Sequence, residues 1–243
     1  MFLVGTKTSQ VDLYFGNVNA DGKIVLEDDE FRHLKVVRTN IGDKIKITDG
    51  NGNLFIAAIS EINKHNYVTT IETTLVEKIS GPTLHLAIAP TKNIDRIEWL
   101  VEKCVELGIN KFSFIQCRHS ERKDVKTDRL KRIAISAIKQ SGKPTLPLIN
   151  EMISFNNFIQ SELEEQRLIC AMEAENDKHI KQLLKPGKNT VILIGPEGDF
   201  HQEEIRSAKD AGFLSTSLGP ERLRTETAAM AACVYFNFNK HGV

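Results

Sequence analysis

Long apolar runs and paired cysteines are both missing from this sequence, and each absence excludes a class of protein. No stretch of its 243 residues approaches the roughly 18 consecutive apolar residues that a membrane-spanning helix requires. Its first residues lack a basic segment followed by an apolar one, so we expect no secretory signal. No CxxC pair occurs, which argues against a zinc ribbon, a redox motif and a disulfide framework; the four cysteines are Cys104, Cys117, Cys170 and Cys233. We therefore expect buried thiols in a cytoplasmic protein that binds no membrane and no metal.

The two commonest nucleotide-binding fingerprints are also missing. No GxxxxGK(S/T) segment occurs, which excludes a Walker A loop, and no GxGxxG segment occurs, which excludes the usual dinucleotide fingerprint. The commonest methyltransferase fold has a glycine loop near its N-terminus, and none is present here. Hydrophobic residues make up 41% of the chain and charged residues 26%, which is an ordinary globular composition and excludes wholesale disorder.

Net charge is absent as well, because 32 Lys and Arg balance 32 Asp and Glu. Charge is nevertheless concentrated between residues 118 and 143, where nine basic residues face three acidic ones. Such a segment is either a solvated helix face or a binding site for a polyanion, and composition alone leaves both open.

The first 72 residues have the pattern of short strands. Residues 44–48 alternate polar and apolar, residues 49–53 form a strong turn, and residues 54–59 resume the apolar pattern, which predicts a hairpin. A short helix is predicted over residues 27–38, with acids in its first turn and bases in its last. These elements favour a compact barrel of short strands with one helix.

After Pro82 the pattern changes to strands that alternate with helices. Strands are predicted at 84–89, 112–115, 168–171, 191–194 and 216–218, and helices at 95–107, around 130–139, at 203–211 and at 226–238. Asp95 and Glu98 have the spacing of a capping box at the start of the first of these helices. The alternation implies an α/β domain with a mostly parallel sheet.

Two glycine–proline loops stand at the ends of predicted strands. Gly195-Pro196-Glu197-Gly198 follows one buried strand, and Gly219-Pro220 follows another and leads into a charged loop with two arginines and two glutamates. Open α/β sheets bind ligands at the carboxyl ends of their strands, and glycine allows the main chain to approach a ligand closely. Each loop alone is also compatible with a plain turn or a solvated surface loop, but the pair favours a binding site.

These loops resemble the signature of the SPOUT methyltransferases, specifically the ribosomal small-subunit RNA methyltransferases E, which modify uracil N3 in 16S ribosomal RNA. The resemblance rests on Gly195–Gly198, on Leu218-Gly219-Pro220, and on Leu-Arg-Thr-Glu-Thr-Ala at residues 223–228. It extends over the whole chain through Glu98, Lys103, Glu106, Leu107, Gly108, Arg118, Ser120, Glu121, Arg122, Ala137, Gln140, Ser141, Gly142 and Pro147, and through His33, Leu34, Arg38, Gly42, Asp43, Asp49 and Gly50.

The chain departs from the family pattern at three places. Lys143 replaces an arginine, the usual arginine near the start of the chain is missing, and Asp199-Phe200-His201 replaces a Gly-Leu/Phe-Ser type sequence. Because serine is a strong N-cap residue, we expect His201 to weaken the start of the following helix. None of these changes falls in the Arg-Thr-Glu-Thr segment.

The resemblance implies an α/β fold of SPOUT type, with a parallel sheet and a deep C-terminal trefoil knot, together with an N-terminal PUA-like β-barrel. It divides the chain into an RNA-binding barrel at 1–72, a linker at 73–82 and a methyltransferase domain at 83–243. It also implies a homodimer that binds S-adenosyl-L-methionine in the knot and acts on 16S ribosomal RNA, with no metal and no membrane partner. The cofactor residues would be Ala171, Ile194, Gly195, Pro196, Glu197, Gly198, Leu218, Gly219, Leu223, Arg224, Thr225, Thr227 and Ala228.

Methylation of uracil N3 removes a proton from a neutral imide, so negative charge develops on N3 and its flanking carbonyl oxygens. Such a reaction needs a donor to stabilise that charge and a base or water path for the proton. We expect Arg224 to be the donor and Glu226 the base or positioning group, with Glu197 as a second candidate. Glu226 could equally serve only as an acid at a helix N-terminus. The expected RNA-binding residues are His33, Arg38, Arg118, Arg122, Lys123, Arg129 and Arg132.

Two other functions remain open at this point. The same fold could methylate a ribose 2′-hydroxyl or another base position, or the chain could bind RNA without catalysis. The N-terminal domain and the Leu-Arg-Thr-Glu-Thr loop favour methylation of uracil N3 over methylation at another position. The intact loops and the charged cluster argue against a protein that only binds RNA.

Overall fold

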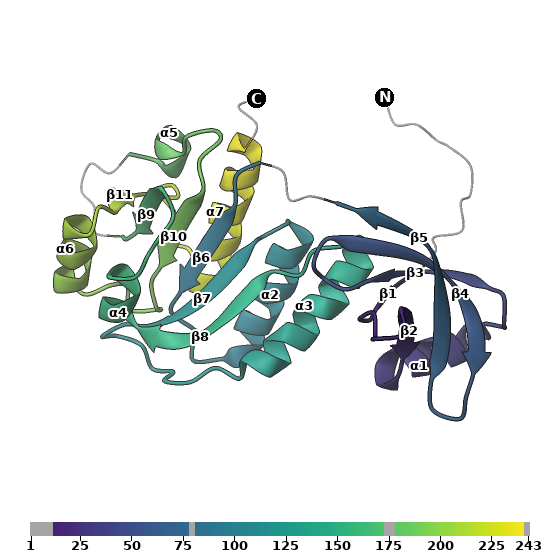
Figure 1. The fold of residues 1–243 in the computed structure, drawn as a ribbon. Helices are drawn as coiled ribbons and strands as arrows, with labels where there is room; N and C mark the ends of the chain where they lie inside the picture. The colour runs from purple at the N-terminus through teal and green to yellow at the C-terminus, as the bar shows by residue number, and fades with distance from the viewer. Residues whose placement is uncertain (1–11, 78–80, 173–177, 241–243) are drawn as a thin grey trace. The chain divides into compact units, whose positions relative to one another are not determined.

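The computed structural model describes residues 12–77, 81–172 and 178–240, which form two compact units (Figure 1). The first unit contains the described residues up to 77 together with 138–146. The second contains residues 81–137 and 147–240. Within the described residues, no helix combines the length and the apolar character needed to cross a membrane.

A five-stranded sheet and one helix make up the first unit. Its elements are β1 (Leu13–Phe15), β2 (Lys23–Leu26), α1 (Asp28–Val36), β3 (Lys44–Thr48), β4 (Asn53–Ile62) and β5 (Tyr67–Val76). The predicted hairpin is confirmed as the antiparallel pair β3–β4, and β5 extends to Val76, inside the segment predicted as a linker. The sheet order β1-β3-β4-β5-β2 leaves two edge strands, so the described strands form an open sheet where the resemblance implies a closed barrel.

The first unit also includes a segment that comes from much later in the chain. The Leu146 amide donates to the Gly50 carbonyl at 2.7 Å, and the Thr48 hydroxyl donates to the Pro144 carbonyl at 2.9 Å. The ammonium group of Lys139 lies 2.5 Å from a carboxylate oxygen of Glu30. Residues 138–146 are therefore held in this unit, although the sequence grouped them with residues 83–243.

The second unit contains a six-stranded sheet, and the prediction of a parallel sheet is confirmed. Every neighbouring pair is parallel, in the order β11-β9-β10-β6-β7-β8. The strands are β6 (Leu84–Ile88), β7 (Lys111–Gln116), β8 (Leu148–Ser154), β9 (Gln166–Cys170), β10 (Thr190–Ile194) and β11 (Leu214–Thr216). The two central strands, β6 and β10, are buried at every position, which explains their continuous apolar sequences.

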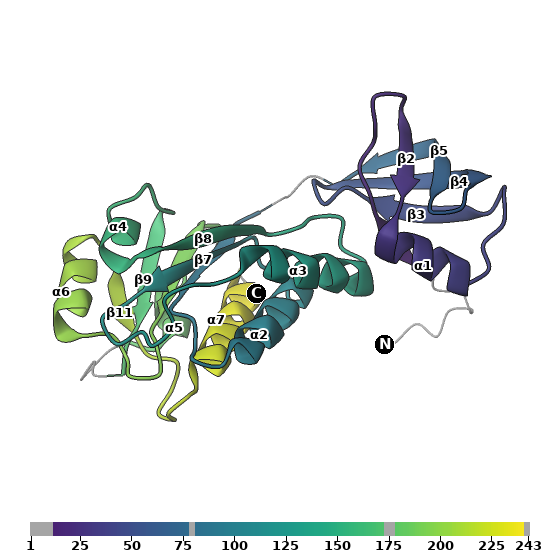
Figure 2. The same cartoon turned by 90° about the horizontal axis from the view of Figure 1, so that it is seen from below.

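Helices cover both faces of this sheet (Figure 2). The helices α2 (Ile94–Glu106), α3 (Thr127–Ser141) and α7 (Thr225–Asn239) lie on one face, and α7 packs against α2, β6 and β10. The helices α4 (Phe155–Ile159) and α6 (Gln202–Asp210) pack together on the other, while the short α5 (Ile180–Leu183) contacts α7. The sequence did not predict β8, α4 or α5, and it placed β11 two residues too late.

Two helix starts differ from the sequence predictions. Asn93 caps α2 by accepting a hydrogen bond from the Asp95 amide, so Asp95 is not the cap. The expectation that His201 weakens α6 is wrong. Its imidazole Nδ1 accepts from the Glu203 amide at 3.3 Å, and the Glu204 carboxylate accepts from the His201 amide at 2.9 Å. A neutral imidazole nitrogen can accept a hydrogen bond as a serine oxygen does, so the capping box is complete.

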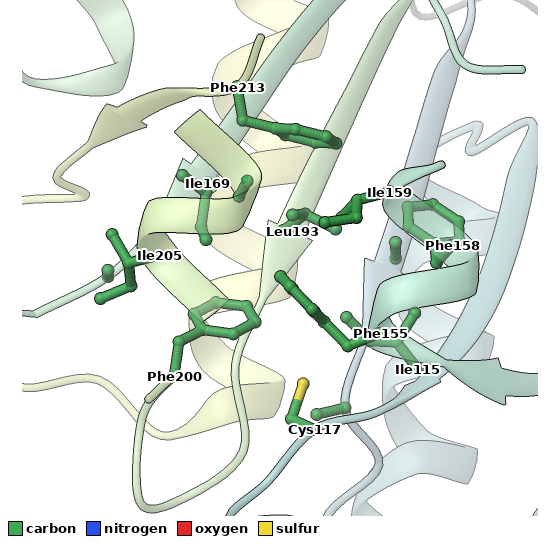
Figure 3. Close-up of a cluster of buried hydrophobic side chains, with 14 of the residues drawn as sticks. Ile115, Cys117, Phe155, Phe158, Ile159, Ile169, Leu193, Phe200, Ile205 and Phe213 are labelled. Atoms are coloured by element: carbon green, nitrogen blue, oxygen red, sulfur yellow. The ribbon is translucent and has the colours of Figure 1, made fainter. Parts of the chain in front are cut away.

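Aromatic side chains fill the core between the sheet and the α4–α6 face. Figure 3 shows Phe155 and Phe200 facing each other beside Leu193, with Cys117 below them. Their ring centroids are 5.7 Å apart. Phe200 comes from the loop after β10 and Phe155 from the first turn of α4, so this cluster fixes the loop that follows β10 to the body of the sheet.

Candidate active site

The carboxyl ends of β9, β10 and β11 meet at one edge of the second unit. Because these strands are parallel neighbours, the segments that follow them lie side by side, although they are separated by more than 20 residues in the sequence. These segments surround two adjoining cavities of about 400 and 200 Å³. Both cavities are lined by Cys170, Met172, Arg222, Leu223 and Ala228, so they share one wall.

All of the predicted cofactor residues except Gly198 and Thr227 line one or both cavities. The larger cavity also has Arg96 and Asp199 in its wall, and the smaller one has Thr216, Ser217, Pro220 and Glu221. The strand-end rule could have found the residues that flank Ala171 and Leu218. It could not have found Arg96, which lies on α2.

Gly195 is required by the aromatic core. A β-carbon at this position would lie 3.1 Å from two ring carbons of Phe200 and 3.3 Å from its backbone nitrogen. Phe200 is itself buried in the cluster of Figure 3, so it has little room to move. The main chain at Gly195 therefore packs on the ring on one side and faces the larger cavity on the other.

Gly219 is required by its backbone conformation. Its φ angle is 129°, a region that L side chains rarely adopt, and a β-carbon there would meet nothing within 4 Å. The Ser217 hydroxyl accepts a hydrogen bond from the Gly219 amide at 3.1 Å and holds the loop in this shape. A side chain at residue 219 would project into open space beside the smaller cavity, so glycine keeps that space free for a ligand.

Asp199 explains one departure from the family pattern. Its φ angle is 62°, in the left-handed region that glycine and aspartate tolerate best. One carboxylate oxygen accepts from the Met172 amide at 2.8 Å and the other from the Phe200 amide at 2.8 Å. Asp199 thus replaces a glycine without backbone conflict and ties the segment after β9 to the loop after β10.

The charged groups around the larger cavity are incompletely paired. The side chains of Arg222 and Arg224 are exposed, and their guanidinium groups make no hydrogen bond or ion pair with the residues that the structure describes. Glu197 accepts a hydrogen bond from the Lys92 amide at 3.1 Å. Glu226 is 8% exposed, and its nearest cation is Arg96, with Nε 3.8 Å from Oε1. The cavity therefore offers free guanidinium donors to a ligand.

Comparison with known proteins identifies the family. Residues 79–237 match the model of an RNA methyltransferase domain, and residues 26–72 match that of an RNA methyltransferase PUA domain. The chain belongs to the RNA methyltransferase family. The resemblance predicted from the two loops is confirmed.

Relatives of this methyltransferase match over nearly their whole length. A probable rRNA-methyltransferase from Porphyromonas gingivalis is 37% identical, with a TM-score of 0.88, over 94% of this chain and 98% of that one. A ribosomal RNA small subunit methyltransferase E from Neisseria gonorrhoeae, solved bound to S-adenosyl methionine, is 26% identical with a TM-score of 0.83 over 95% and 98%. A protein of the same name from Rickettsia conorii is 29% identical over 87% of this chain and 88% of its own.

The basic segment of this methyltransferase is partly occupied by internal contacts. Arg118 pairs with Glu203 at 2.8 Å, and Arg129 pairs with Glu98 at 2.6 Å. The Arg122 guanidinium donates to the carbonyls of Thr91 and Lys92, at 3.0 and 2.6 Å. Among the described residues, the side chains of Lys123 and Arg132 have no such partner. In the first unit, Arg38 is exposed and His33 lies 3.5 Å from Asp12.

A larger cavity of the methyltransferase, about 720 Å³, lies at the carboxyl ends of β7 and β8. It shares no lining residue with the two cavities above, and its wall carries both signs of charge, from Arg118, Lys123, Glu203 and Glu204. Arg118 and Glu203 neutralise each other, and Glu204 accepts from the backbone amides of Arg118 and His201. By size alone this cavity would be the candidate for the active site, but the glycine loops and the unpaired arginines line the two adjoining cavities.

The cysteines of the methyltransferase carry no binding role that the structure reveals. Cys104, Cys117 and Cys233 are buried, as predicted, and burial raises the pKa of the Cys117 thiol well above its ordinary value. Cys170 is half-buried and lies in the wall shared by the two cavities. Across residues 12–77, 81–172 and 178–240, no group of three or more His, Cys, Asp or Glu side chains is arranged to hold a metal ion.

Proposed function

We propose that this chain transfers a methyl group from S-adenosylmethionine to N3 of a uridine in 16S ribosomal RNA, within the cytoplasm. The family match and the relatives named as small subunit methyltransferases support an rRNA substrate. The observation that carries the proposal is the pair of cavities between three strand-end loops, where free guanidinium groups stand beside glycine main chain.

The described residues fit S-adenosylmethionine by size and chemistry. Ile194, Leu218 and Leu223 supply apolar walls for an adenine ring, and the main chain at Gly195 and Gly219 has no side chain to block hydrogen bonds to it. When bound, the cofactor supplies a methyl group on a positively charged sulfur. Arg222 and Arg224 are the cationic groups that could hold its carboxylate or the substrate.

The reaction exchanges the N3 proton of uracil for a methyl group. As the N3–H bond breaks, negative charge spreads over N3 and the two carbonyl oxygens, and Arg224 donates hydrogen bonds to that charge. The proton leaves to Glu226, to Glu197 or to water. A donor of this kind, aimed at developing charge, is worth on the order of 100- to 1000-fold in rate.

The substrate must present an unpaired base. N3 is a pairing atom in an RNA duplex, so the target uridine has to be single-stranded or flipped out before it enters the site. We assign the RNA contacts to the N-terminal domain of residues 1–72, through His33 and Arg38, and to the basic segment, through Arg118, Arg122, Lys123, Arg129 and Arg132. We keep residues 73–82 as the linker and residues 83–243 as the methyltransferase domain in this proposal, with two exceptions that the fold requires: β5 continues to Val76, and residues 138–146 pack in the first unit.

We also propose a homodimer and a trefoil knot formed by the segment from β11 through α7. The support for a dimer is the apolar character of α7 and of the surface beside it. Phe238 is 76% exposed, and together with Tyr235, Lys181 and Asn239 it lines a further cavity of about 300 Å³. A surface of this kind favours contact with a second protein surface. Light scattering at micromolar concentration should give twice the chain mass, and a monomer mass would contradict the dimer.

Nucleoside analysis tests the proposed reaction. The protein is incubated with labelled S-adenosylmethionine and small ribosomal subunits that lack the modification, and the RNA is then digested. Label in 3-methyluridine supports the proposal. Label in a 2′-O-methyl nucleoside or at another base position would replace it with a different RNA methylation, and RNA binding without label would indicate a protein that only binds.

A further inference from the structure

An arginine and a buried glutamate meet where α2 and α7 begin. Arg96 is in the first turn of α2 and Glu226 is in the first turn of α7, and these two helices pack against each other. Arg96 Nε lies 3.8 Å from Glu226 Oε1. The other oxygen, Oε2, is buried and accepts no hydrogen bond from any described residue. Buried polar atoms are rarely left unpaired. Of the buried carboxylate oxygens without a described hydrogen-bond partner, which belong to Glu30, Glu98 and Glu226, the Glu226 oxygen belongs to a residue whose cation partner, Arg96, lines the larger cavity.

Only one member of the pair reaches the larger cavity. Arg96 lines that cavity together with Arg222 and Arg224, whereas Glu226 is absent from its described wall. The Arg96 side chain is 35% exposed and that of Glu226 only 11%. The guanidinium is therefore the member of the pair that a ligand in this cavity can reach, and the carboxylate is the more buried one.

The chemistry of the two side chains assigns them different roles. Arginine is a donor with a rigid fork and stays protonated, so it can bind a carbonyl oxygen or an anion but cannot remove a proton. Uracil N3 lies between two carbonyl oxygens, and both gain negative charge when N3 loses its proton. Cytosine presents an amino group in place of one of them, and that group is itself a donor. Of the three arginines in the cavity, Arg96 on α2 and Arg224 at the N-cap of α7 are the two donors that would match the two carbonyl oxygens of uracil and not cytosine.

We propose that Arg96 is a further catalytic residue, which donates to a uracil carbonyl oxygen beside N3, and that Glu226 is a positioning residue that holds Arg96. This inference rests on the proposed function, and it reduces the number of candidate proton acceptors. Glu226 would not be the base, so the N3 proton would leave to Glu197 or to water.

A double-mutant cycle tests the coupling of the two residues. Single-turnover rates are measured for Arg96→Lys, Glu226→Gln and the double variant, with saturating S-adenosylmethionine and small subunits that lack the modification. We expect a loss on the order of 100-fold for Arg96→Lys, because lysine lacks the planar fork. Glu226→Gln should lose about 10-fold, and the double variant should be no slower than Arg96→Lys, since residues that act as a unit are not additive.

Glu106→Gln is the matched control. It removes a carboxylate that pairs with Lys103 on α2 at 2.9 Å, away from the cavity. We expect its rate to equal that of the unmodified protein. Melting temperatures of all variants, and calorimetric titrations with S-adenosylhomocysteine, separate loss of chemistry from loss of folding or cofactor binding. All variants should keep wild-type affinity for S-adenosylhomocysteine.

A binding readout tests the interaction with the anion directly. The 5-fluorouridine N3 proton dissociates at lower pH than that of uridine. We therefore expect the affinity of the unmodified protein for small-subunit rRNA transcribed with 5-fluorouridine to increase as the pH rises. The increase should be smaller for Arg96→Lys, measured in the same way. Equal pH dependence in the two proteins would overturn the role of Arg96.

Other outcomes also contradict the inference. If the single effects multiply in the double variant, or if Glu226→Gln is slower than Arg96→Lys, Glu226 acts on the substrate itself. If Arg96→Lys loses affinity for S-adenosylhomocysteine, the pair of Arg96 and Glu226 binds the cofactor and not the uracil ring. These results differ from failure of the proposed function, in which the unmodified protein forms no 3-methyluridine.

Discussion

A cluster of polar side chains lies at each end of the parallel sheet, and the two clusters differ in how completely they are paired. There, His85 is buried with Nδ1 3.0 Å from Glu164 and Nε2 2.8 Å from the Ser113 hydroxyl, which also accepts from Asn150 at 2.9 Å. At the carboxyl end, the side chains of Arg222 and Arg224 have no partner among the described residues, and Glu226 Oε2 is buried without one. Paired groups stabilise the fold, whereas the unpaired guanidinium groups of Arg222 and Arg224 are available to a ligand.

Both ends of the sheet carry residue types that are common in active sites, but only the carboxyl end can reach a substrate. Ser113, His85 and Glu164 are linked in the order of a hydrolase triad, yet Ser113 is 3% exposed and lines none of the four cavities above. Access distinguishes the two ends of the sheet. A catalytic group must reach a substrate, and at the carboxyl end the glycine loops leave space for one.

The largest effect should come from Arg224→Ala. Loss of a donor aimed at developing charge should lower the single-turnover rate on the order of 100- to 1000-fold, about 3 to 4 kcal/mol, with little change in melting temperature. Because the defect lies in the chemical step, more RNA should not restore the rate. Near-normal turnover with weakened RNA binding would instead mean that Arg224 binds a phosphate.

Gly219→Val should remove cofactor binding. A ligand at 100 times its Kd stabilises the native state by about 2.7 kcal/mol, so S-adenosylhomocysteine should raise the melting temperature of the unmodified protein and not that of the variant. Gly187→Val is the matched control. It has the same kind of φ angle, +74°, and open space around it, but it lies outside both cavities. Loss of the ligand-induced shift in both variants would indicate general backbone strain.

His85→Phe should change stability and leave catalysis intact. It removes the imidazole partner of the buried Ser113 hydroxyl and one of the partners of Glu164, which costs about 1 to 3 kcal/mol in the free energy of unfolding. Denaturant titration measures this cost, and single-turnover rates should match the unmodified protein. A rate loss comparable with that of Arg224→Ala would show that the amino end also takes part in the chemistry.

The pH dependence of stability sharpens the same contrast. Burial lowers the pKa of His85 below its ordinary 6.5, against the opposing hydrogen bond and charge of Glu164. The unfolded chain then binds a proton more readily, so the His85 contribution is complete above pH 6.5 and is lost as the pH falls through the lowered folded-state pKa. Unfolding measured between pH 7 and pH 5 should show this decline in the unmodified protein and less of it in His85→Phe.

The smallest effect on the methylation rate should come from replacing the exposed basic residues. Lys123→Ala with Arg132→Ala should weaken binding of all RNA sequences, and the salt slope should fall by about 0.7 to 0.9 for each phosphate that is no longer neutralised. Saturating RNA should restore the rate. Arg122 and Arg129 are poorer choices, because they hold the Thr91–Lys92 backbone and Glu98. An unchanged salt slope would show that this surface does not bind phosphates.

Local sequence patterns were enough to place the strand-end loops. The apolar run before Gly195 predicts a buried strand, the residues before Gly219 predict a short one, and the parallel arrangement brings the ends of the two strands together. The short α4 and α5 were missed because five and four residues are too few for a helical period to show. The open edge of the five-stranded sheet depends on tertiary pairing that no local pattern encodes.

Contacts between residues far apart in the sequence account for the features of the site that could not be predicted. Arg96 meets Glu226 at the cavity because α7 packs against α2 on the sheet, although the two residues are 130 positions apart in the chain. The basic segment is partly neutralised in the same way, since Arg118 pairs with Glu203, 85 positions away. Composition could count the charges there but could not tell which of them were already neutralised.

Measurement of rate and stability for Arg224→Ala and His85→Phe in parallel tests the central claim most directly. The account predicts a crossed result: Arg224→Ala loses single-turnover rate and keeps its free energy of unfolding, and His85→Phe loses free energy of unfolding and keeps its rate. If each variant loses both quantities in proportion, the two ends of the sheet do not divide chemistry from stability, and the account is contradicted.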